Sequence, residues 1–316
     1  MARVSIGMPV YNGADFIVET LESILAQDYT DFELIISDNA STDATREICE
    51  SYASRDPRIS YSRLPENLGA ARNYNRVFEL ASGEFFKWAA HDDLLTPRFL
   101  SSCVAAFDTG PPEAVLVHPA TRVIDEAGRP VRGVGDDPDR TTELVFSRRL
   151  ERMLVTPEDV QSILHRCFPV FGLFRRSALE RSSLIANFPR SDMLLLVQLA
   201  LIGPFLAIDE ELFIYRRHLN NSIMSAEKNG RGTDLERRIA HWFDPRRGKY
   251  FPATVTRLSM GFLRAALRLP DSTSDRMTAT RIVLYWIWKR KRQIAGEIKI
   301  VLRERLMGPT LRYAPE

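Results

Sequence analysis

The amino-acid sequence predicts an α/β fold in which a mostly parallel sheet is covered by helices on both faces. In the first 107 residues, short apolar runs alternate with segments of helical periodicity, about 10 to 15 residues each, which is typical of parallel sheets. Polar or turn-forming residues follow each apolar run. With 45% apolar and 27% charged residues, the 316-residue chain has the composition of a globular protein.

Four strands and four helices are predicted in this first part. The strands are the apolar runs at residues 4–8, 32–36, 59–63 and 84–89. Each helix is predicted from apolar residues spaced three and four apart. Ser41, Thr42 and Asp43 are candidate N-caps of the second helix. The third helix covers residues 70–80, and Pro97 lies in the first turn of the fourth.

The sequence becomes less regular after residue 112. Further strands are predicted at residues 114–118, 121–124, 170–174 and 212–218. A helix is predicted at 157–167, a second, strongly apolar helix begins near Asp192, and residues 133–140 form an exposed loop.

Four polar segments follow the predicted strands of the first part. They are residues 11–12, Asp38, residues 67–73 and the pair Asp92-Asp93. Ligands of parallel sheets bind beyond the carboxyl ends of the strands, so we expect these segments to meet in one crevice.

Several common sites are excluded by their missing motifs. The sequence has no GxGxxG after the first strand, no GxxxxGK[ST] loop and no GxSxG elbow. Asp92 and Asp93 supply the oxygen ligands that Mg²⁺ or Mn²⁺ prefers. Taken alone, the pair fits an ordinary helix-preceding acidic turn better than a metal site.

The order of five motifs identifies a family. Residues 9–12 (PVYN), 37–43 (SDNASTD), 67–73 with NLG and RN, 82–84 (SGE) and 91–97 (HDDLLTP) resemble the family-2 glycosyltransferases of the GT-A fold. The similarity extends over about residues 3 to 220 and is strongest up to about residue 107. It implies a catalytic domain over residues 1–222, with a nucleotide-sugar-binding half at 1–107 and an acceptor-binding half at 108–222.

The resemblance implies an inverting glycosyltransferase that uses a nucleotide-sugar donor. Pro9, Tyr11 and Asn12 correspond to residues that pack against the nucleotide, and a tyrosine ring at this place lines or stacks on a base. Asp38 corresponds to an aspartate that binds the base, which favours uracil because a carboxylate accepts a hydrogen bond from the imide N–H. The donor expected is therefore a UDP-sugar.

The diphosphate is expected to contact two further positions. Gly69 corresponds to a residue beside the nucleotide, where glycine permits a close backbone approach. Arg72 corresponds to a residue that forms charge-assisted hydrogen bonds to phosphate. Without the family context, an ordinary turn glycine and a solvated arginine would explain both.

The resemblance also implies a divalent cation, Mn²⁺ or Mg²⁺, on the diphosphate. Asp92 and Asp93 are the expected ligands, and Asp92 also lies by the nucleotide; the family often has another acidic residue where this chain has Ala90. Arg216 and His218 match a basic block near the diphosphate in related enzymes, with His218 a candidate metal ligand. Both also fit a solvent-exposed strand end.

Inverting transfer requires a general base opposite the leaving nucleoside diphosphate. Asp192 opens the apolar helix of the second half and is the expected base. Its alternative role is an N-cap of that helix, for which Ser191 competes.

The C-terminal residues 223–316 predict a helical extension that begins with a polar loop. Helices are expected at 233–243 and 252–269, and a single helix of about 39 Å at 282–307. Its aromatic start and basic middle indicate an amphipathic tail on an anionic membrane. The same pattern fits a helix packed on the catalytic domain or on another subunit.

The net charge of +2 argues against a general nucleic-acid binder, yet it conceals an asymmetry. Residues 281–316 hold nine basic and three acidic residues, a net charge of +6, which leaves −4 elsewhere. No apolar run is long enough for a membrane-spanning helix, and the N-terminus lacks the pattern of a signal peptide. Three cysteines without CxxC spacing fit buried thiols in a reducing compartment. We therefore expect a cytoplasmic protein, with contact to the inner face of the membrane through residues 281–316.

Two other functions fit parts of the sequence. A sugar-1-phosphate nucleotidyltransferase shares an α/β nucleotide-binding core, but residues 9–13 lack its glycine-rich, basic loop. A non-catalytic binding protein of the same fold is consistent with Ala90. The expected acceptor of the favoured reaction is a glycan or a lipid-linked glycan.

Overall fold

The computed structural model describes residues 2–131, 146–154, 168–218, 233–246 and 250–308. The helix predicted at 157–167, the loop at 133–140, Cys167 and most of the polar loop after residue 222 lie outside these ranges.

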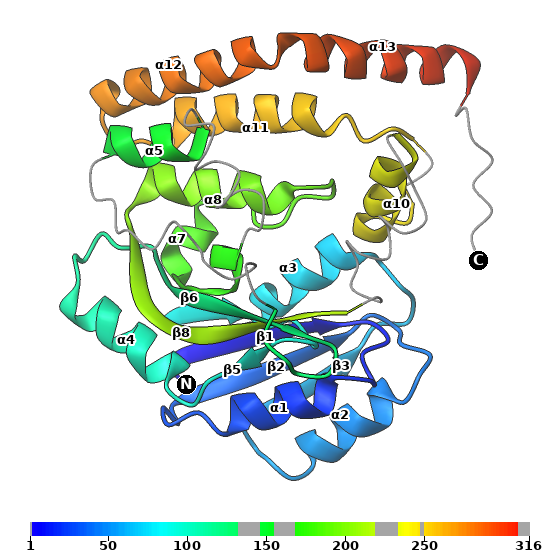
Figure 1. The fold of residues 1–316 in the computed structure, drawn as a ribbon, viewed down its shortest axis with the longest axis vertical. Helices are drawn as coiled ribbons and strands as arrows, with labels where there is room; N and C mark the ends of the chain where they lie inside the picture. The colour runs from blue at the N-terminus through cyan, green and yellow to red at the C-terminus, as the bar shows by residue number, and fades with distance from the viewer. Residues whose placement is uncertain (1, 132–145, 155–167, 219–232, 247–249, 309–316) are drawn as a thin grey trace.

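One eight-stranded sheet forms the centre of the molecule, in the order β3-β2-β1-β4-β7-β6-β8-β5 (Figure 1). Its strands are β1 (Val4–Val10), β2 (Phe32–Asp38), β3 (Ile59–Arg63), β4 (Phe85–Trp88), β5 (Leu94–Leu95), β6 (Leu116–Asp125), β7 (Leu173–Arg175) and β8 (Phe205–Arg217). β1 pairs in parallel with β2 and β4, β2 with β3, and β6 with β8, whereas β7 and β5 pair antiparallel with their neighbours. The predicted α/β class and mostly parallel sheet are confirmed.

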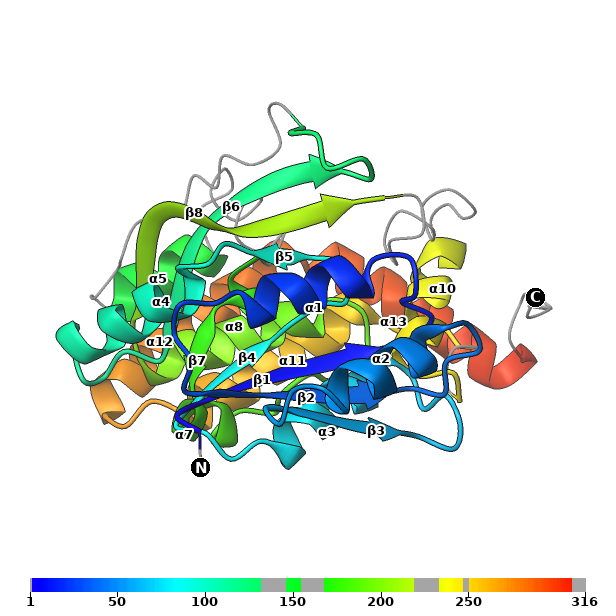
Figure 2. The same ribbon diagram turned by 90° about the horizontal axis from the view of Figure 1, so that it is seen from below.

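Helices cover both faces of the sheet, and each face has its own apolar core (Figures 1 and 2). One face carries α1 (Ile17–Leu25), α2 (Thr45–Ala53) and α4 (Phe99–Thr109). The other carries α3 (Ala70–Leu80), α5 (Phe146–Leu154), α7 (Arg176–Glu180) and α8 (Ser191–Ile202). Alternate residues of a strand enter opposite cores, as Phe85 and Phe86 of β4 do.

Two sequence predictions in the second half were wrong in detail. The strands predicted at 114–118 and 121–124 are one strand, β6, because a register shift at Pro119–Ala120 accommodates the proline within its pairing to β8. The strand predicted at 170–174 is the 3-10 helix η1 (Phe168–Phe171) followed by β7. There the Gly172 N–H donates to the Pro169 carbonyl and closes a turn.

The C-terminal extension forms α10 (Thr233–Phe243), α11 (Thr254–Arg268), α12 (Thr273–Lys289) and α13 (Lys291–Met307). The single helix predicted at 282–307 is thus two helices, separated at Arg290. The inward residues change at this break, from apolar ones such as Val283 and Trp286 in α12 to Glu297 and Glu304 in α13. Figure 1 shows α12 and α13 running end to end along the edge of the molecule farthest from α1 and α2.

The extension shares a core with α8. Leu258 and Phe262 of α11 and Trp286 of α12 belong to the same buried cluster as Leu194 and Leu195 of α8. Within the described part of the chain, no helix is both long and apolar enough to cross a membrane. Cys49 and Cys103 are buried free thiols, as predicted.

Candidate functional site

The candidate site lies where the strand order reverses around β1. β1 has β2 on one side and β4 on the other, and all three strands run in the same direction. The segments that follow them therefore meet at one edge of the sheet, as the sequence predicted. Val10, the last residue of β1, stands beside Asp38, the last residue of β2.

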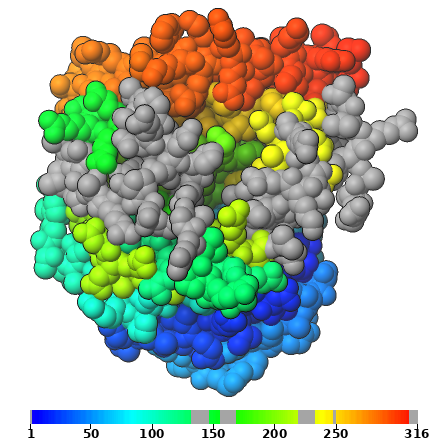
Figure 3. Space-filling view, viewed as in Figure 1, coloured from blue at the N-terminus to red at the C-terminus, as the bar shows by residue number. Residues whose placement is uncertain are grey.

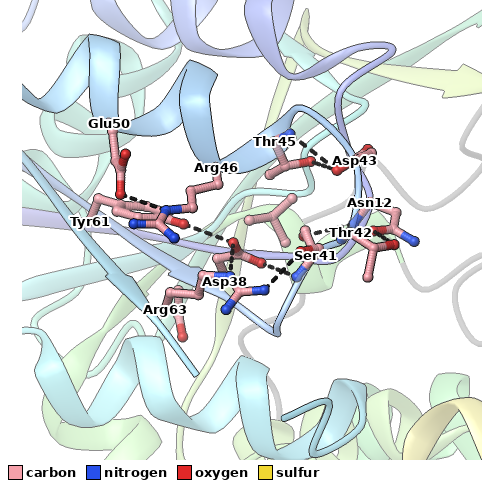
Figure 4. A network of polar contacts seen from close by, with 12 residues as sticks. Asn12, Asp38, Ser41, Thr42, Asp43, Thr45, Arg46, Glu50, Tyr61 and Arg63 are labelled. Atoms are coloured by element: carbon pink, nitrogen blue, oxygen red, sulfur yellow. Dashed lines mark hydrogen bonds and ion pairs between the residues drawn. The ribbon is translucent and has the colours of Figure 1, made fainter. Parts of the chain in front are cut away.

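Hydrogen bonds join the loop after β1 to the loop after β2 (Figure 4). The Asn12 N–H donates to the Ser41 hydroxyl at 2.9 Å, and Asn12 Oδ1 accepts from the Thr42 N–H at 2.8 Å. Asn12 has a left-handed backbone with φ of 51°, a conformation that asparagine tolerates better than most residues. Pro9 is buried within β1, whereas the side chain of Tyr11, just after β1, is exposed.

Asp38 is fully buried and already bonded within the protein. Its Oδ1 accepts from the Ser41 N–H at 2.8 Å, and its Oδ2 accepts from the Tyr61 hydroxyl at 2.8 Å (Figure 4). The guanidinium of Arg63 lies 3.5 Å from the same Oδ2. In this arrangement the carboxylate supports the loop, and its complete burial, rather than a lack of free lone pairs, separates it from a base.

The Asn67–Gly69 turn meets the C-terminal extension. Gly69 has φ of +85°, and a Cβ on it would lie 2.5 Å from the Phe243 carbonyl oxygen and 2.6 Å from Pro245 Cδ. In this structure the backbone of Gly69 therefore packs closely against the last residue of α10 and the chain that follows it. Arg72, in the first turn of α3, is exposed and has no hydrogen bond or ion pair to another described residue.

Asp92 and Asp93 lie beside the end of β8. Pairing of β5 with β8 brings the two carboxylates next to Arg216 and His218. Nε2 of His218 lies 2.9 Å from Asp92 Oδ2, and Asp93 Oδ1 accepts from the Arg216 N–H at 2.9 Å. The structure thus brings Asp92 and Asp93 together with Arg216 and His218, more than 120 positions away along the chain.

Arg216 is buried and bonded within the protein. Its guanidinium donates to Glu19 Oε2 at 2.5 Å and to the Asp92 carbonyl at 3.2 Å, and lies over the ring of Phe16. As placed, its side chain supports the segment that carries Asp92.

The two neighbouring carboxylates differ in protonation behaviour. Burial and the charge of Asp92 raise the pKa of Asp93 well above its ordinary value. Burial also disfavours the charged form of Asp92, but the hydrogen bond from His218 and the charges of His91 and His218 outweigh it and lower the pKa of Asp92. When two carboxylates lie close together, a negative charge on one disfavours a negative charge on the other.

The donor set partly fits a divalent cation. Asp93 Oδ2 and His218 Nδ1 are both buried and have no hydrogen-bond partner among the described residues. A carboxylate oxygen and an imidazole nitrogen suit Mn²⁺. However, nowhere in the described ranges do three acidic, histidine or cysteine side chains gather as metal ligands. Any bound cation would take its remaining ligands from substrate or water.

Asp192 lies in the first turn of α8, where the helix dipole favours a negative charge. It is half-buried, and its Oδ1 accepts from the Met193 N–H at 2.9 Å. Tyr74 of α3 interacts electrostatically with Asp192 and also with Asp92 and Asp93. Burial raises the pKa of Tyr74, and the negative charges of Asp92, Asp93 and Asp192 raise it further. All three carboxylates are therefore near enough to act electrostatically on one side chain.

Three contributors to the site were missed in the sequence. Glu19, the ionic partner of Arg216, lies 197 residues from it, and nothing in the sequence indicates their contact. Tyr74 lies in mid-helix and resembles an ordinary core tyrosine. Phe243 contacts the Gly69 turn through its backbone carbonyl, and the order of side chains in the sequence does not indicate such a backbone contact.

Comparison with known proteins agrees with this geometry. The family model described as glycosyl transferase family 2 matches residues 5–182, more than half of the chain. TuaG of Bacillus subtilis, a putative teichuronic acid biosynthesis glycosyltransferase, is 41% identical over 90 residues, which are 28% of this chain and 36% of that protein. The uncharacterized protein Mb1547 of Mycobacterium bovis is 33% identical over 232 residues, which are 72% of this chain and 61% of that protein. The matched part therefore covers less than two thirds of either relative.

Solved structures share the whole fold. TarS of S. aureus (residues 1–349), solved in complex with UDP-GlcNAc, superposes with a TM-score of 0.55 at 18% identity and covers 99% of this chain and 94% of that one. The likeness supports the GT-A fold. The motif order, the meeting of the segments after β1, β2 and β4 at one edge of the sheet, and the family match agree: the chain belongs to glycosyl transferase family 2.

Proposed function

We propose that this protein transfers a sugar, with inversion, from a nucleotide-diphosphate donor to a hydroxyl of a glycan or lipid-linked glycan. The observation that carries the proposal is the Asp92-Asp93 pair held beside His218 at the carboxyl edge of the sheet, with Asp192 in the first turn of α8. Inverting transfer needs charge compensation at the leaving diphosphate and a base on the opposite side. A lipid-linked acceptor would place the protein at the cytoplasmic face of a membrane.

Asp192 is the proposed general base. Its place in the first turn of α8, half-buried and bonded to the Met193 N–H, would hold the carboxylate in a fixed position to accept a proton. In the reaction it would take the proton of the acceptor hydroxyl while that oxygen forms a bond to the anomeric carbon. The bond from this carbon to the diphosphate oxygen breaks, and the nucleoside diphosphate leaves with the electron pair.

Asp92, Asp93 and His218 are the proposed holders of Mn²⁺ or Mg²⁺. The two buried atoms without partners, Asp93 Oδ2 and His218 Nδ1, support this assignment. A bound cation would offset charge on the departing diphosphate. Arg72, exposed and without a described partner, is the proposed protein cation for phosphate.

The proposed nucleotide contacts are Pro9, Tyr11 and Asn12 on one side and Asp38 and Gly69 on the other. The exposed ring of Tyr11 is suited to lie against a base. UDP is favoured on the strength of Asp38, whose present bonds to Ser41 and Tyr61 make it a support for the base pocket as much as a direct contact.

A donor screen tests the proposed reaction. The full chain is incubated with UDP-, dTDP- and GDP-sugars and Mn²⁺, and released nucleoside diphosphate is measured. UDP release that depends on Mn²⁺ is expected. A sugar-1-phosphate nucleotidyltransferase would instead form pyrophosphate from a nucleoside triphosphate and a sugar-1-phosphate. Nucleotide binding without release from any donor would point to a non-catalytic protein, which the alanine at position 90 makes a real alternative.

A further inference from the structure

The outer side of α12 and α13 carries a stripe of large apolar side chains. Successive members are four, seven or ten residues apart and are exposed: Met277, Leu284, Trp288, Ile298, Leu302 and Leu306. Leu306 is 85% exposed, Met277 65% and Trp288 58%. The two helices form a continuous ridge along one edge of the molecule (Figure 3). We call the exposed side of residues 277–307 the outer face.

The outer face carries positive charges without negative ones. The only acidic residues between 277 and 307 are Glu297 and Glu304, and both point inward. Glu297 accepts from the N–H groups of Val255 and Thr256, and Glu304 pairs with the buried Arg237. Seven exposed cations remain, with no ion pair to any described residue: Arg281, Lys289, Lys291, Arg292, Lys299, Arg303 and Arg305.

Aromatic rings and cations adjoin each other on this face. The ring of Tyr285 stacks with that of Trp288, and Nζ of Lys291 lies 4.5 Å from the centre of the Trp288 ring. Aromatic rings are suited to the headgroup layer of a bilayer, whose anionic lipids attract the neighbouring cations.

We propose that the outer face of α12 and α13 binds the surface of an anionic lipid bilayer, with both helices lying in the membrane plane. A second copy of the chain fits the face less well, because a two-fold interface would oppose seven unpaired cations to seven more. The inference concerns surface attachment alone and does not depend on the reaction proposed above.

Vesicle co-sedimentation tests this attachment. The full chain is mixed with vesicles of phosphatidylcholine, or of phosphatidylcholine with a quarter phosphatidylglycerol. Strong pelleting is expected only with the anionic vesicles, and high salt should weaken it. Lys291→Glu/Lys299→Glu should lower the partition coefficient at least about tenfold, since each cation near the surface contributes about fivefold. Trp288→Ser should lower it about tenfold.

Matched controls lie away from the outer face. Leu80→Ser removes a similarly exposed apolar side chain from α3, and Arg98→Glu reverses an exposed charge before α4. Both should pellet like the wild type. Thermal melting of every variant shows whether it is folded, and UDP release without vesicles shows separately whether the proposed reaction occurs.

Tryptophan fluorescence gives an independent readout. Trp88 and Trp286 are buried, so in a Trp242→Phe background Trp288 is the exposed indole. Its emission should shift to the blue with anionic vesicles only. Equal pelleting of wild type and Lys291→Glu/Lys299→Glu, or an unshifted Trp288, would overturn the proposal. Light scattering that shows a dimer dissociated by Trp288→Ser would assign the face to a second copy instead.

Discussion

Nε2 of His218, just after β8, lies 2.9 Å from Oδ2 of Asp92, in the segment after β4. This hydrogen bond joins two parts of the chain separated by 126 residues and turns the imidazole so that its other nitrogen, Nδ1, faces no described partner. A histidine held by a carboxylate in this way is oriented as metal ligands commonly are.

Replacing His218 should therefore weaken cation binding more than it weakens the fold. His218→Ala is expected to lower the Mn²⁺ affinity about 10- to 100-fold, measured by calorimetry in the presence of UDP. His241→Ala on α10 is the control and should bind Mn²⁺ as the wild type does. An unchanged affinity in His218→Ala would remove this residue from the proposed cation site.

Gly69→Ala should destabilise the protein by about 2 to 4 kcal/mol. Part of the cost, about 1 kcal/mol, arises from the positive φ, and the rest from the Cβ placed against the Phe243 carbonyl. Gly128→Ala has a similar φ of +78° but open space around it, so it should cost only about 1 kcal/mol. Urea unfolding of the two variants measures the difference, and equal costs would show that the contact with Phe243 is unimportant.

Glu297 caps a helix that has no cap of its own. α11 begins after Ala253, and the N–H groups of Val255 and Thr256 donate to the Glu297 carboxylate at 3.0 and 2.7 Å. Glu297→Ala should lower the free energy of unfolding by about 2 to 3 kcal/mol because it leaves buried donors unpaired. Glu297→Gln should recover part of the loss, and Lys299→Ala, on the exposed side of α13, should change little. A loss of under about 0.5 kcal/mol in Glu297→Ala would contradict the capping role.

Lys87 should make stability depend on pH. It is fully buried between the rings of Phe99 and Phe213, and burial lowers its pKa to about 7. The unfolded chain, with a lysine pKa of about 10.4, then holds the proton more tightly than the folded one, so stability rises with pH above 7. Between about pH 6 and about pH 8.5 the rise from this group should be about 2 kcal/mol.

The matched comparison for Lys87 is Lys87→Met, measured by urea unfolding across the same pH range. The difference in unfolding free energy between the wild type and Lys87→Met should change by this amount, because other titrating groups are common to both. A difference that does not vary with pH would mean that Lys87 keeps its ordinary pKa in the fold.

Much of the first 110 residues could be predicted because the information is local. Four of the five strands before residue 110 and all four helices follow from periodicity, and parallel pairing then places Asp38 and Asp92-Asp93 at one edge of the sheet. The two-residue strand β5 was not predicted. Pro97 is a small exception: α4 begins two residues later, at Phe99, and the Arg98 between them is its N-cap.

The remaining features depend on long-range contacts. Arg216 pairs with Glu19, and Gly69 packs against Phe243. Each partner is distant in the sequence, so the residues that flank Arg216 or Gly69 do not indicate the contact. The break at Arg290 likewise follows from what α12 and α13 pack against. Continuous helical periodicity through residues 282–307 contains no proline or glycine at that position to announce it.

The central claim is that Asp192 is the general base and that the Asp92-Asp93 pair holds the cation. One pair of variants tests it. UDP binding in Mn²⁺ and UDP release from the donor are measured for Asp192→Ala and Asp92→Ala, with the exposed Asp271→Ala as control. Asp192→Ala should bind UDP as the wild type does and lose release by at least about 100-fold, whereas Asp92→Ala should lose Mn²⁺-dependent binding. Full release by Asp192→Ala would contradict its assignment as the base.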